Sequence, residues 1–275
     1  GALAEYFGAI EGASLEANKG AYSYAWMIIF AVIAAIMVLI GLYHIRMLPS
    51  NQIPSTTKKT TSEVGRELVA VIANFFTKKH IFYYICFIIL YRLAEGFIMK
   101  IAPLFLRASR EVGGLGLSLK EIGTLNGVFG SAAFVLGSLL AGIYVSKFGL
   151  KRTLFTLCCI FNLPFVAYTF LAVTQPTNVY LIGTCITMEY FGYGFGFVGL
   201  TLFMMQQIAP GKHQMSHYAF ASGIMNLGVM LPGMVSGYFS DLLGYRDFFI
   251  YVLIATIPAF LITYFIPFTY DDSKK

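Results

Sequence analysis

Residues 81–106 read IFYYICFIILYRLAEGFIMKIAPLFL, an apolar run long enough to cross a lipid bilayer that nevertheless holds three charged side chains. These are Arg92, Glu95 and Lys100. Charge at membrane depth costs several kcal/mol unless it faces the protein interior or a water-filled cavity, so such a group is by default functional. A second apolar run, 179–208, holds Glu189. The two runs indicate a membrane protein with a polar path, as in a transport protein.

Composition places the whole chain in the membrane class. Of its 275 residues, 58% are hydrophobic and 12% are charged, whereas a soluble domain averages about 45–50% and about 25%. Seven stretches approach the roughly 20 apolar residues that a span requires. They are residues 22–45, 81–106, 122–145, 153–173, 179–208, 218–239 and 248–268. The predicted fold is therefore an all-α membrane protein with seven transmembrane helices.

The cysteine and glycine patterns indicate no metal or cofactor site. The four cysteines all fall inside apolar stretches at spacings that do not match zinc ligands, and we interpret them as small packing residues: Cys86, Cys158, Cys159 and Cys185. The glycines at 192, 194, 196 and 199 lie inside an apolar stretch with no strand before it. Close helix packing or local flexing is therefore favoured over a phosphate-binding loop. We expect no cofactor and no metal ion.

Basic residues predict how the chain lies in the membrane. Twelve fall on the side of residues 43–80, namely Arg46, Lys58, Lys59, Arg66, Lys78, Lys79, Lys147, Lys151, Arg152, Lys212, Lys274 and Lys275. Five fall on the other side, namely Lys19, Arg107, Arg110, Lys120 and Arg246. The positive-inside rule then places residues 43–80 and the C-terminus in the cytoplasm. The net charge of +6 follows from this topology and requires no nucleic-acid partner.

The order of the stretches predicts three parts. Residues 1–46 form an outer loop and one transmembrane helix, residues 47–80 a cytoplasmic linker, and residues 81–275 a six-helix transmembrane domain. Because Gly1 replaces a starting Met and no signal-peptide core follows, we expect a fragment that begins in an extramembrane loop. Apolar residues recur at helical spacing over residues 64–76 of the linker. This amphipathic segment either lies along the membrane surface as a hinge or is a solvated connector.

An internal repeat divides the six predicted helices of the last part into two sets of three. Residues 142–151 read GIYVSKFGLK, and residues 237–246, 95 positions later, read GYFSDLLGYR. Each copy ends one predicted helix and turns into the next. Because the copies lie three helices apart, the two sets have opposite orientations in the membrane, which is a transporter signature.

The glycines of the repeat have two expected roles. Gly142 and Gly237 lack a Cβ and are expected to let helices approach closely. Gly149 and Gly244 are expected to adopt the positive φ that a sharp turn requires.

The repeated motif resembles the loop signature of the major facilitator superfamily. Its pattern is a Gly, three residues, an acid, two residues, a Gly and a nearby basic residue. The first copy has Ser146 in place of the acid, whereas the second keeps Asp241. The basic residues Lys151 and Arg246 can bond the last carbonyls of a helix or pair with an acid. The resemblance implies a twelve-helix transporter, of which this chain holds the sixth helix, the central linker and the C-terminal half. The missing N-terminal half would be its partner.

Several shorter motifs resemble AmpG-type muropeptide permeases. They are YRLAEG at 91–96, PLFL at 103–106, LKEIG at 119–123, EYFGYGFGF at 189–197, FMM at 203–205 and SHYAFAS at 216–222. The resemblance implies proton-driven symport of anhydro-muropeptides across the inner membrane of Gram-negative bacteria. Acetyl-coenzyme A carriers are relatives of these permeases, so a carrier of that compound or of another solute is the alternative.

Both predicted carboxylates lie at middle depth, where transporter binding sites are found. Glu95 is 14 residues into a helix that enters from the cytoplasm, about 21 Å along its axis. Glu189 is 10 residues into a helix that enters from outside, about 15 Å along. Only a shared cavity would keep Arg92 and both acids away from lipid, so we expect the two helices to line one.

The candidate substrate- or proton-binding residues are Arg92, Glu95, Lys100, Glu189, Tyr190 and Tyr193. Arg92 and Glu95 can pair along one helix face, either around an exchangeable proton or as a permanent structural pair. Glu189 is neutral, paired with Arg92 or Lys100, or exposed to cavity water. Lys100 contacts substrate or snorkels to the interface. The two tyrosines stack on sugar rings, supply hydroxyls or simply pack.

Two other classes fit the sequence less well. Seven helices suggest a receptor-like or retinal protein, but residues 248–268 contain no lysine for a Schiff base. A membrane enzyme would need a catalytic motif, and the four histidines, at 44, 80, 213 and 217, form none. We therefore predict a secondary active transporter, not an enzyme, in the bacterial inner membrane. Its expected partners are the lipid bilayer, protons and a muropeptide or related sugar-containing solute.

Overall fold

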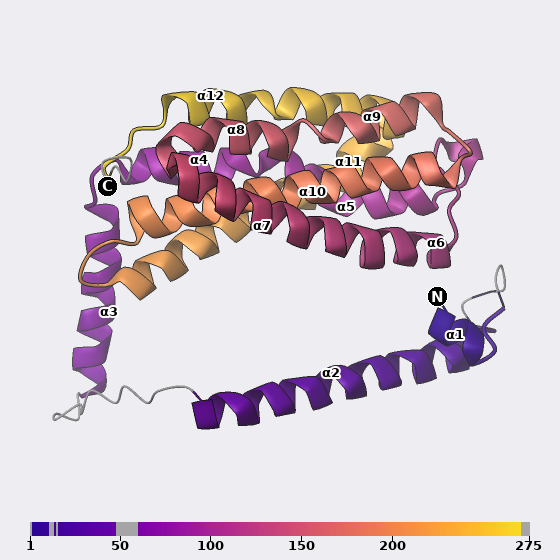
Figure 1. The fold of residues 1–275 in the computed structure, drawn as a ribbon, viewed down its shortest axis with the longest axis horizontal. Coiled ribbons are helices and arrows are strands. Elements are labelled where there is room, and N and C mark those ends of the chain that lie inside the picture. The colour runs from indigo at the N-terminus through magenta and orange to yellow at the C-terminus, as the bar shows by residue number, and fades with distance from the viewer. Residues whose placement is uncertain (1, 11–13, 15, 48–59, 271–275) are drawn as a thin grey trace. The chain divides into compact units, whose positions relative to one another are not determined.

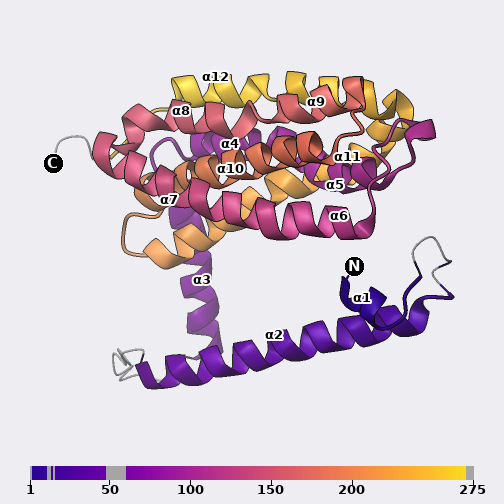
Figure 2. The ribbon, with the colours of Figure 1, turned by 45° about the vertical axis from the view of Figure 1, so that its right-hand side comes forward.

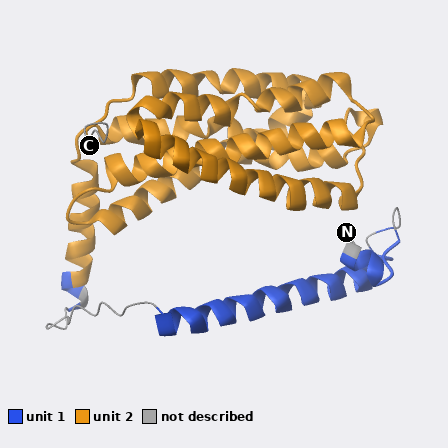
Figure 3. Ribbon diagram, in the orientation of Figure 1, with its two compact units in different colours: residues 1–63 blue, residues 64–275 orange. Residues whose placement is uncertain are grey.

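The computed structural model describes residues 2–10, 14, 16–47 and 60–270, and every regular element among them is helical. This agrees with the predicted all-α class. The chain divides into two compact units, residues 1–63 and 64–275 (Figure 3). The three predicted parts have other boundaries and stay a prediction. Residues 48–59 of the predicted linker lie outside the described residues.

The first unit consists of α1 (Ala2–Tyr6) packed on α2 (Lys19–Met47). Asn18 closes the loop between them, because its side-chain oxygen accepts a hydrogen bond from the Ile10 N–H and its amide donates to the Ile10 carbonyl, each at 2.8 Å. With 29 mostly apolar residues, α2 has the length of a bilayer span.

The second unit is a bundle of long helical rods (Figures 1 and 2). From α3 onward the elements are α3 (Thr61–Phe76), α4 (Ile81–Tyr91), α5 (Leu93–Arg107), the 3₁₀ turn η1 (Arg110–Val112), α6 (Leu119–Thr124), the π-helical η2 (Leu125–Gly130), α7 (Ser131–Phe148), α8 (Leu150–Asn162), α9 (Phe165–Thr174), α10 (Val179–Phe203), the π-helical η3 (Met204–Ile208), α11 (Gln214–Ala255) and α12 (Ile257–Phe265). Within the bundle, α10 packs on α7 and α8, α11 packs on α5, and α12 packs on α4 and α8.

Five described helical segments are long and apolar enough to cross a membrane, whereas the sequence predicted seven. The five are residues 19–47, 81–107, 119–148, 150–174 and 214–265. Two features account for the difference. In the 25-residue helix α10, glycine, tyrosine and Glu189 lower the mean hydropathy. The 52-residue segment 214–265 counts once, although the non-helical residue Gly244 divides it into two helices.

Glycines bring α10 close to its neighbours. A Cβ at Gly194 would overlap the backbone carbonyl of Phe134 on α7, and one at Gly192 would lie 2.6 Å from the Pro164 ring. Gly196 meets α8 in the same way, against Phe161. The predicted role of these glycines in close helix packing is confirmed, since small residues let membrane helices approach backbone to backbone.

The two turns of the internal repeat share one backbone conformation. Gly149 has φ 77° and ψ 149°, and Gly244 has φ 71° and ψ 164°. This region is accessible essentially to glycine alone, so the predicted reason for both glycines is confirmed.

The expectation for Gly142 and Gly237 was wrong within this chain. A Cβ added at either position would meet no atom within 4 Å. Both residues lie on helix faces that no described neighbour approaches, so close helix contact does not explain them here.

The helix α3 is anchored to the bundle at its C-terminal end. Phe75 is 1% exposed and packs against the rings of His217 and Phe220 on α11. Just beyond the helix, the Lys78 ammonium donates to the Pro210 carbonyl at 2.7 Å and also to that of Ile208. Burial lowers the pKa of Lys78 from its usual value. The amphipathic helix that the sequence predicted is present, and its first apolar residues remain exposed.

Candidate functional site

The site begins where the rod of α4 and α5 is interrupted. Arg92 has φ −104° and ψ 5° and separates the two helices, so that α5 starts anew with Glu95 in its first turn. The side chains of Arg92 and Glu95 are only 5% and 7% exposed. Arg92 Nε donates to Glu95 Oε2 at 2.6 Å, and Nη2 donates to Oε1. The result is a buried two-pronged pair, which is the strong form of an Arg–carboxylate contact.

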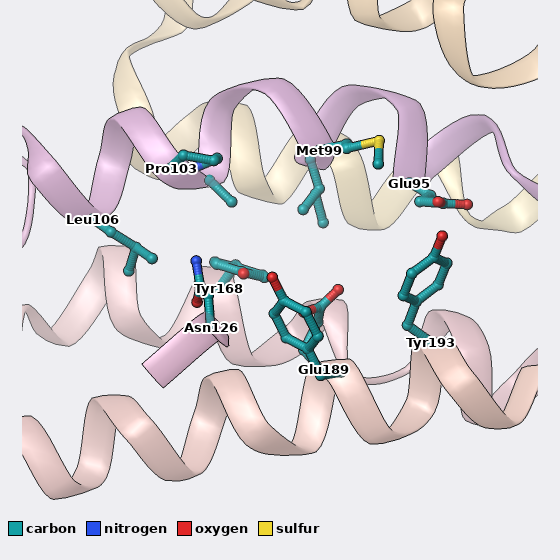
Figure 4. A pocket seen from close by; sticks show the side chains of 11 residues that line it. Glu95, Met99, Pro103, Leu106, Asn126, Tyr168, Glu189 and Tyr193 are labelled. Carbon is teal, nitrogen blue, oxygen red and sulfur yellow. The ribbon is translucent and has the colours of Figure 1, made fainter. Parts of the chain in front are cut away.

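The Arg92 guanidinium has an aromatic neighbour on α10. Its Cζ lies 5.4 Å from the centre of the Phe197 ring, within the range of a cation–π contact. The neighbouring Tyr193 points its hydroxyl toward Glu95 from the same helix (Figure 4). Both partners of the ion pair therefore have an aromatic neighbour on α10.

A cavity of about 110 Å³ lies beside this pair, between α5, η2, α9 and α10 (Figure 4). It has room for several water molecules. Its polar lining residues are Glu95, Asn126, Tyr168, Glu189, Tyr190 and Tyr193, and its apolar ones are Ile98, Met99, Ala102, Pro103 and Leu106. The structure thus brings Glu95 and Glu189 to one cavity, as the sequence predicted. Arg92 is held against Glu95 and does not line the cavity.

Glu189 faces the cavity without a cation. Among the described residues it has neither a hydrogen bond nor a salt bridge, although its side chain is half-buried. Arg92 is engaged by Glu95. Lys100 is exposed, lies along α11 beside Gly233 and does not reach the cavity. Of the alternatives for Glu189, the ion pairs with Arg92 and with Lys100 are therefore absent from this structure.

The aromatic residues divide into cavity and core. Tyr190 and Tyr193 line the cavity, and the Tyr190 ring rests on Gly130 at the end of η2. Tyr91, by contrast, is fully buried between Phe87 and Phe161 and donates from its hydroxyl to the Gly196 carbonyl at 2.9 Å. Tyr91 is a packing residue that ties α4 to α10.

Two cavity residues were not anticipated. For Asn126, an amide in the middle of a span, interhelical hydrogen bonding is the default role, yet its amide lies in the cavity. Tyr168, on α9, received no role from the sequence, and a lone tyrosine in an apolar stretch offered no signal. A polar side chain in the middle of a span was the only available hint for Asn126.

The loop-motif residues lie away from the cavity. Asp241 is exposed on α11. The Arg246 guanidinium lies 4.0 Å from the carboxylate of the adjacent Asp247, and both side chains are largely exposed. At this distance and exposure the pair contributes little to stability.

Comparison with known proteins adds a separate line of evidence. The anhydromuropeptide permease of Escherichia coli (strain K12) is 23% identical over 209 residues, which cover 76% of this chain and 41% of that protein. The putative transporter AmpG 1 of Rickettsia bellii is 25% identical over 238 residues, 85% of this chain and 56% of the relative. The chain is similar to AmpG-type permeases. The putative transporter AmpG 2 of Rickettsia prowazekii, 27% identical over 72% of this chain and 47% of its own length, supports the same likeness.

The resemblance to AmpG-type permeases that the short motifs predicted is confirmed by these relatives. The chain spans about half the length of the curated relatives it matches. No protein-family model matches the chain. The likeness to permeases and the membrane-length helices agree on a membrane protein related to transporters.

Proposed function

We propose that the chain is part of a proton-coupled permease for anhydro-muropeptides or related sugar-containing solutes. The observation that carries the proposal is the pair of carboxylates, Glu95 and Glu189, that face one cavity from two different rods of the bundle. The permease names of the relatives support the transport class and the muropeptide substrate. A site at the meeting of two repeats is the arrangement expected of a secondary transporter.

The proposed architecture is a six-helix domain with one further helix. Six helical rods of this domain cross the membrane in the proposal. They are α4 with α5, α6 with α7, α8 with α9, α10 with η3, and the two parts of 214–265 on either side of Gly244. The turns at Gly149 and Gly244 support two three-helix repeats of opposite orientation. In this proposal α2 belongs with a separate N-terminal half, and the C-terminus lies in the cytoplasm of the bacterial inner membrane.

The proposed roles of the two acids differ. Arg92 compensates the charge of Glu95, so this pair orients the cavity wall and positions the Tyr193 hydroxyl. Glu189 has no such compensation, and a lone carboxylate charge is costly when the cavity is dry. The proton on Glu189 is therefore the one that a change in cavity hydration can add or remove. In this role Glu189 couples proton movement to the solute, and Tyr190 beside it contacts the solute.

Acetyl-coenzyme A is the less favoured solute. Its phosphates would require basic side chains, and the described cavity lining contains two carboxylates and no lysine or arginine. Lys100 is exposed outside the lining, and Arg92 is bound to Glu95. A sugar or peptide, with its many hydroxyl and amide donors, suits an acceptor-rich cavity better.

Uptake by the intact protein in proteoliposomes tests this function. Glu189→Gln should abolish accumulation driven by a pH gradient while leaving part of the exchange of labelled for unlabelled anhydro-muropeptide, since exchange does not require proton release. The matched control is Glu111→Gln, at an exposed acid on η1 outside the cavity. Normal accumulation in Glu189→Gln would remove the coupling role from Glu189, and no uptake by the wild type would reject the substrate.

A further inference from the structure

Asn126 lies in a short stretch of unusual backbone. Residues Leu125–Gly130 are π-helical, and the N–H of Ser131 reaches back five residues to the Asn126 carbonyl. A π-helical turn inserts one extra residue into a rod and changes the direction in which its side chains point, and such turns are frequent at functional sites. Here the turn directs the amide of Asn126 into the cavity that Glu95 and Glu189 share.

This stretch is fixed against α10 at both ends. At its start, the Leu125 side chain fills the space that a Cβ of Gly183 would occupy. At its end, Gly130 lies against the Tyr190 ring, where a Cβ would be 3.0 Å from three ring atoms. The position of Asn126 relative to Glu189 and Tyr190 is therefore set by packing.

The side-chain oxygen of Asn126 has no donor. Its Oδ1 is buried and lacks a hydrogen-bond partner in the described structure. A buried acceptor without a donor is rare in native proteins, and each case calls for a physical reason. The nearby carboxylates are themselves acceptors when ionised, and none of the tyrosine hydroxyls that line the cavity donates to this oxygen in the described structure.

A second asparagine shows what a purely structural case looks like. Asn162 on α8 also has a buried Oδ1 without a partner, and its amide donates to the Cys158 carbonyl at 3.0 Å. Asn162 does not line the cavity. The two asparagines share the same unsatisfied atom and differ in access to the cavity, which makes Asn162 a matched control.

We propose that Asn126 contacts the transported solute and contributes to its selection. Its Oδ1 accepts a hydrogen bond from an uncharged hydroxyl or amide N–H of the solute. A cavity of about 110 Å³ admits one such group, whereas ligand pockets for whole small molecules run to about 300–1,000 Å³. The group recognised is thus one hydroxyl-bearing or amide-bearing end of the solute. This inference rests on the proposed transport function.

Binding of anhydro-muropeptide to the purified intact protein provides the test. Asn126→Leu keeps the side-chain size and removes the acceptor. Its dissociation constant should rise about tenfold, equivalent to about 1.4 kcal/mol, which is in the range for a lost hydrogen bond with a buried partner left unsatisfied. Asn162→Leu should change the melting temperature but leave the dissociation constant within about twofold of the wild type. If Asn126→Leu does not fold, Asn126→Ala makes the same comparison.

A double variant separates the solute from Glu189 as the source of the donor. In a Glu189→Met background, which has no donor at position 189, the effect of Asn126→Leu should persist if the donor belongs to the solute. Loss of that effect would mean that the protonated Glu189 is the donor, and the inference would be overturned. Unchanged affinity in Asn126→Leu would also overturn it while leaving the transport function intact. A wild-type protein that binds no anhydro-muropeptide would reject the proposed substrate and this inference together.

Discussion

Replacing the two members of the buried Arg92–Glu95 pair, singly and together, measures whether the pair is needed for folding. Arg92→Met leaves the Glu95 carboxylate, whose side chain is 7% exposed, without its guanidinium. Removing one partner of a buried ion pair typically costs about 3–5 kcal/mol, whereas replacing both partners by apolar residues is often neutral or stabilising. The single variant should therefore lose about 3–5 kcal/mol, and Arg92→Met/Glu95→Met should recover most of that loss.

Thermal unfolding of the purified protein in detergent is the measurement. For a domain of this size, about 3–5 kcal/mol corresponds to a fall in melting temperature of roughly 6–20 °C. The double variant should melt within about 4 °C of the wild type and should no longer transport. Equal destabilisation in the single and double variants would refute the argument, because it would place the cost in lost packing around Phe197 and Tyr193 and not in the unpaired charge.

Three further substitutions have defined outcomes. Gly194→Ala should destabilise the protein by about 1–3 kcal/mol in a thermal melt, because the added Cβ overlaps the carbonyl of Phe134. Its control, Gly223→Ala, should be neutral or slightly stabilising, because a Cβ added there meets no described atom within 4 Å. Gly244→Ala should cost about 1–3 kcal/mol at its φ of 71° and ψ of 164°, and a melt equal to that of the Gly223→Ala control would contradict the strain. Lys78→Met should weaken the attachment of α3, because it removes a charge-assisted hydrogen bond to the Pro210 carbonyl at 2.7 Å. Hydrogen exchange in residues 61–76 should then be faster, and unchanged exchange would show that Phe75 alone holds the helix.

The parts of the fold that follow from local rules could be predicted from the sequence. The excess of apolar residues indicates membrane-length helices, and a glycine at the same place in both repeat copies indicates a positive-φ turn. The i, i+3 spacing of Arg92 and Glu95 was enough to expect their pairing. Counting residues along the two predicted helices placed Glu95 and Glu189 at middle depth in the membrane. The structure places both residues on one cavity.

Features that depend on which way a helix face turns could not be predicted. Asn126 reaches the cavity because η2 is π-helical, and the sequence LNGVFG gives no sign of that extra residue. Lys100, on the same helix as Glu95, points out of the cavity. Gly142 and Gly237 have no close neighbour among the described residues, because a missing Cβ permits contact without requiring it. Each outcome is set by the packing of other helices and not by the local sequence.

The matching turns at Gly149 and Gly244 bear on how such a chain can change over evolutionary time. Two copies of a turn motif can change in their side chains, and the copies here already differ, with Ser146 in one and Asp241 in the other. The backbone at the two glycines cannot drift in the same way, because no residue with a side chain adopts φ near 70–80° with ψ near 150–165° without strain. These two positions therefore keep the two copies of the motif alike in backbone where their side chains differ.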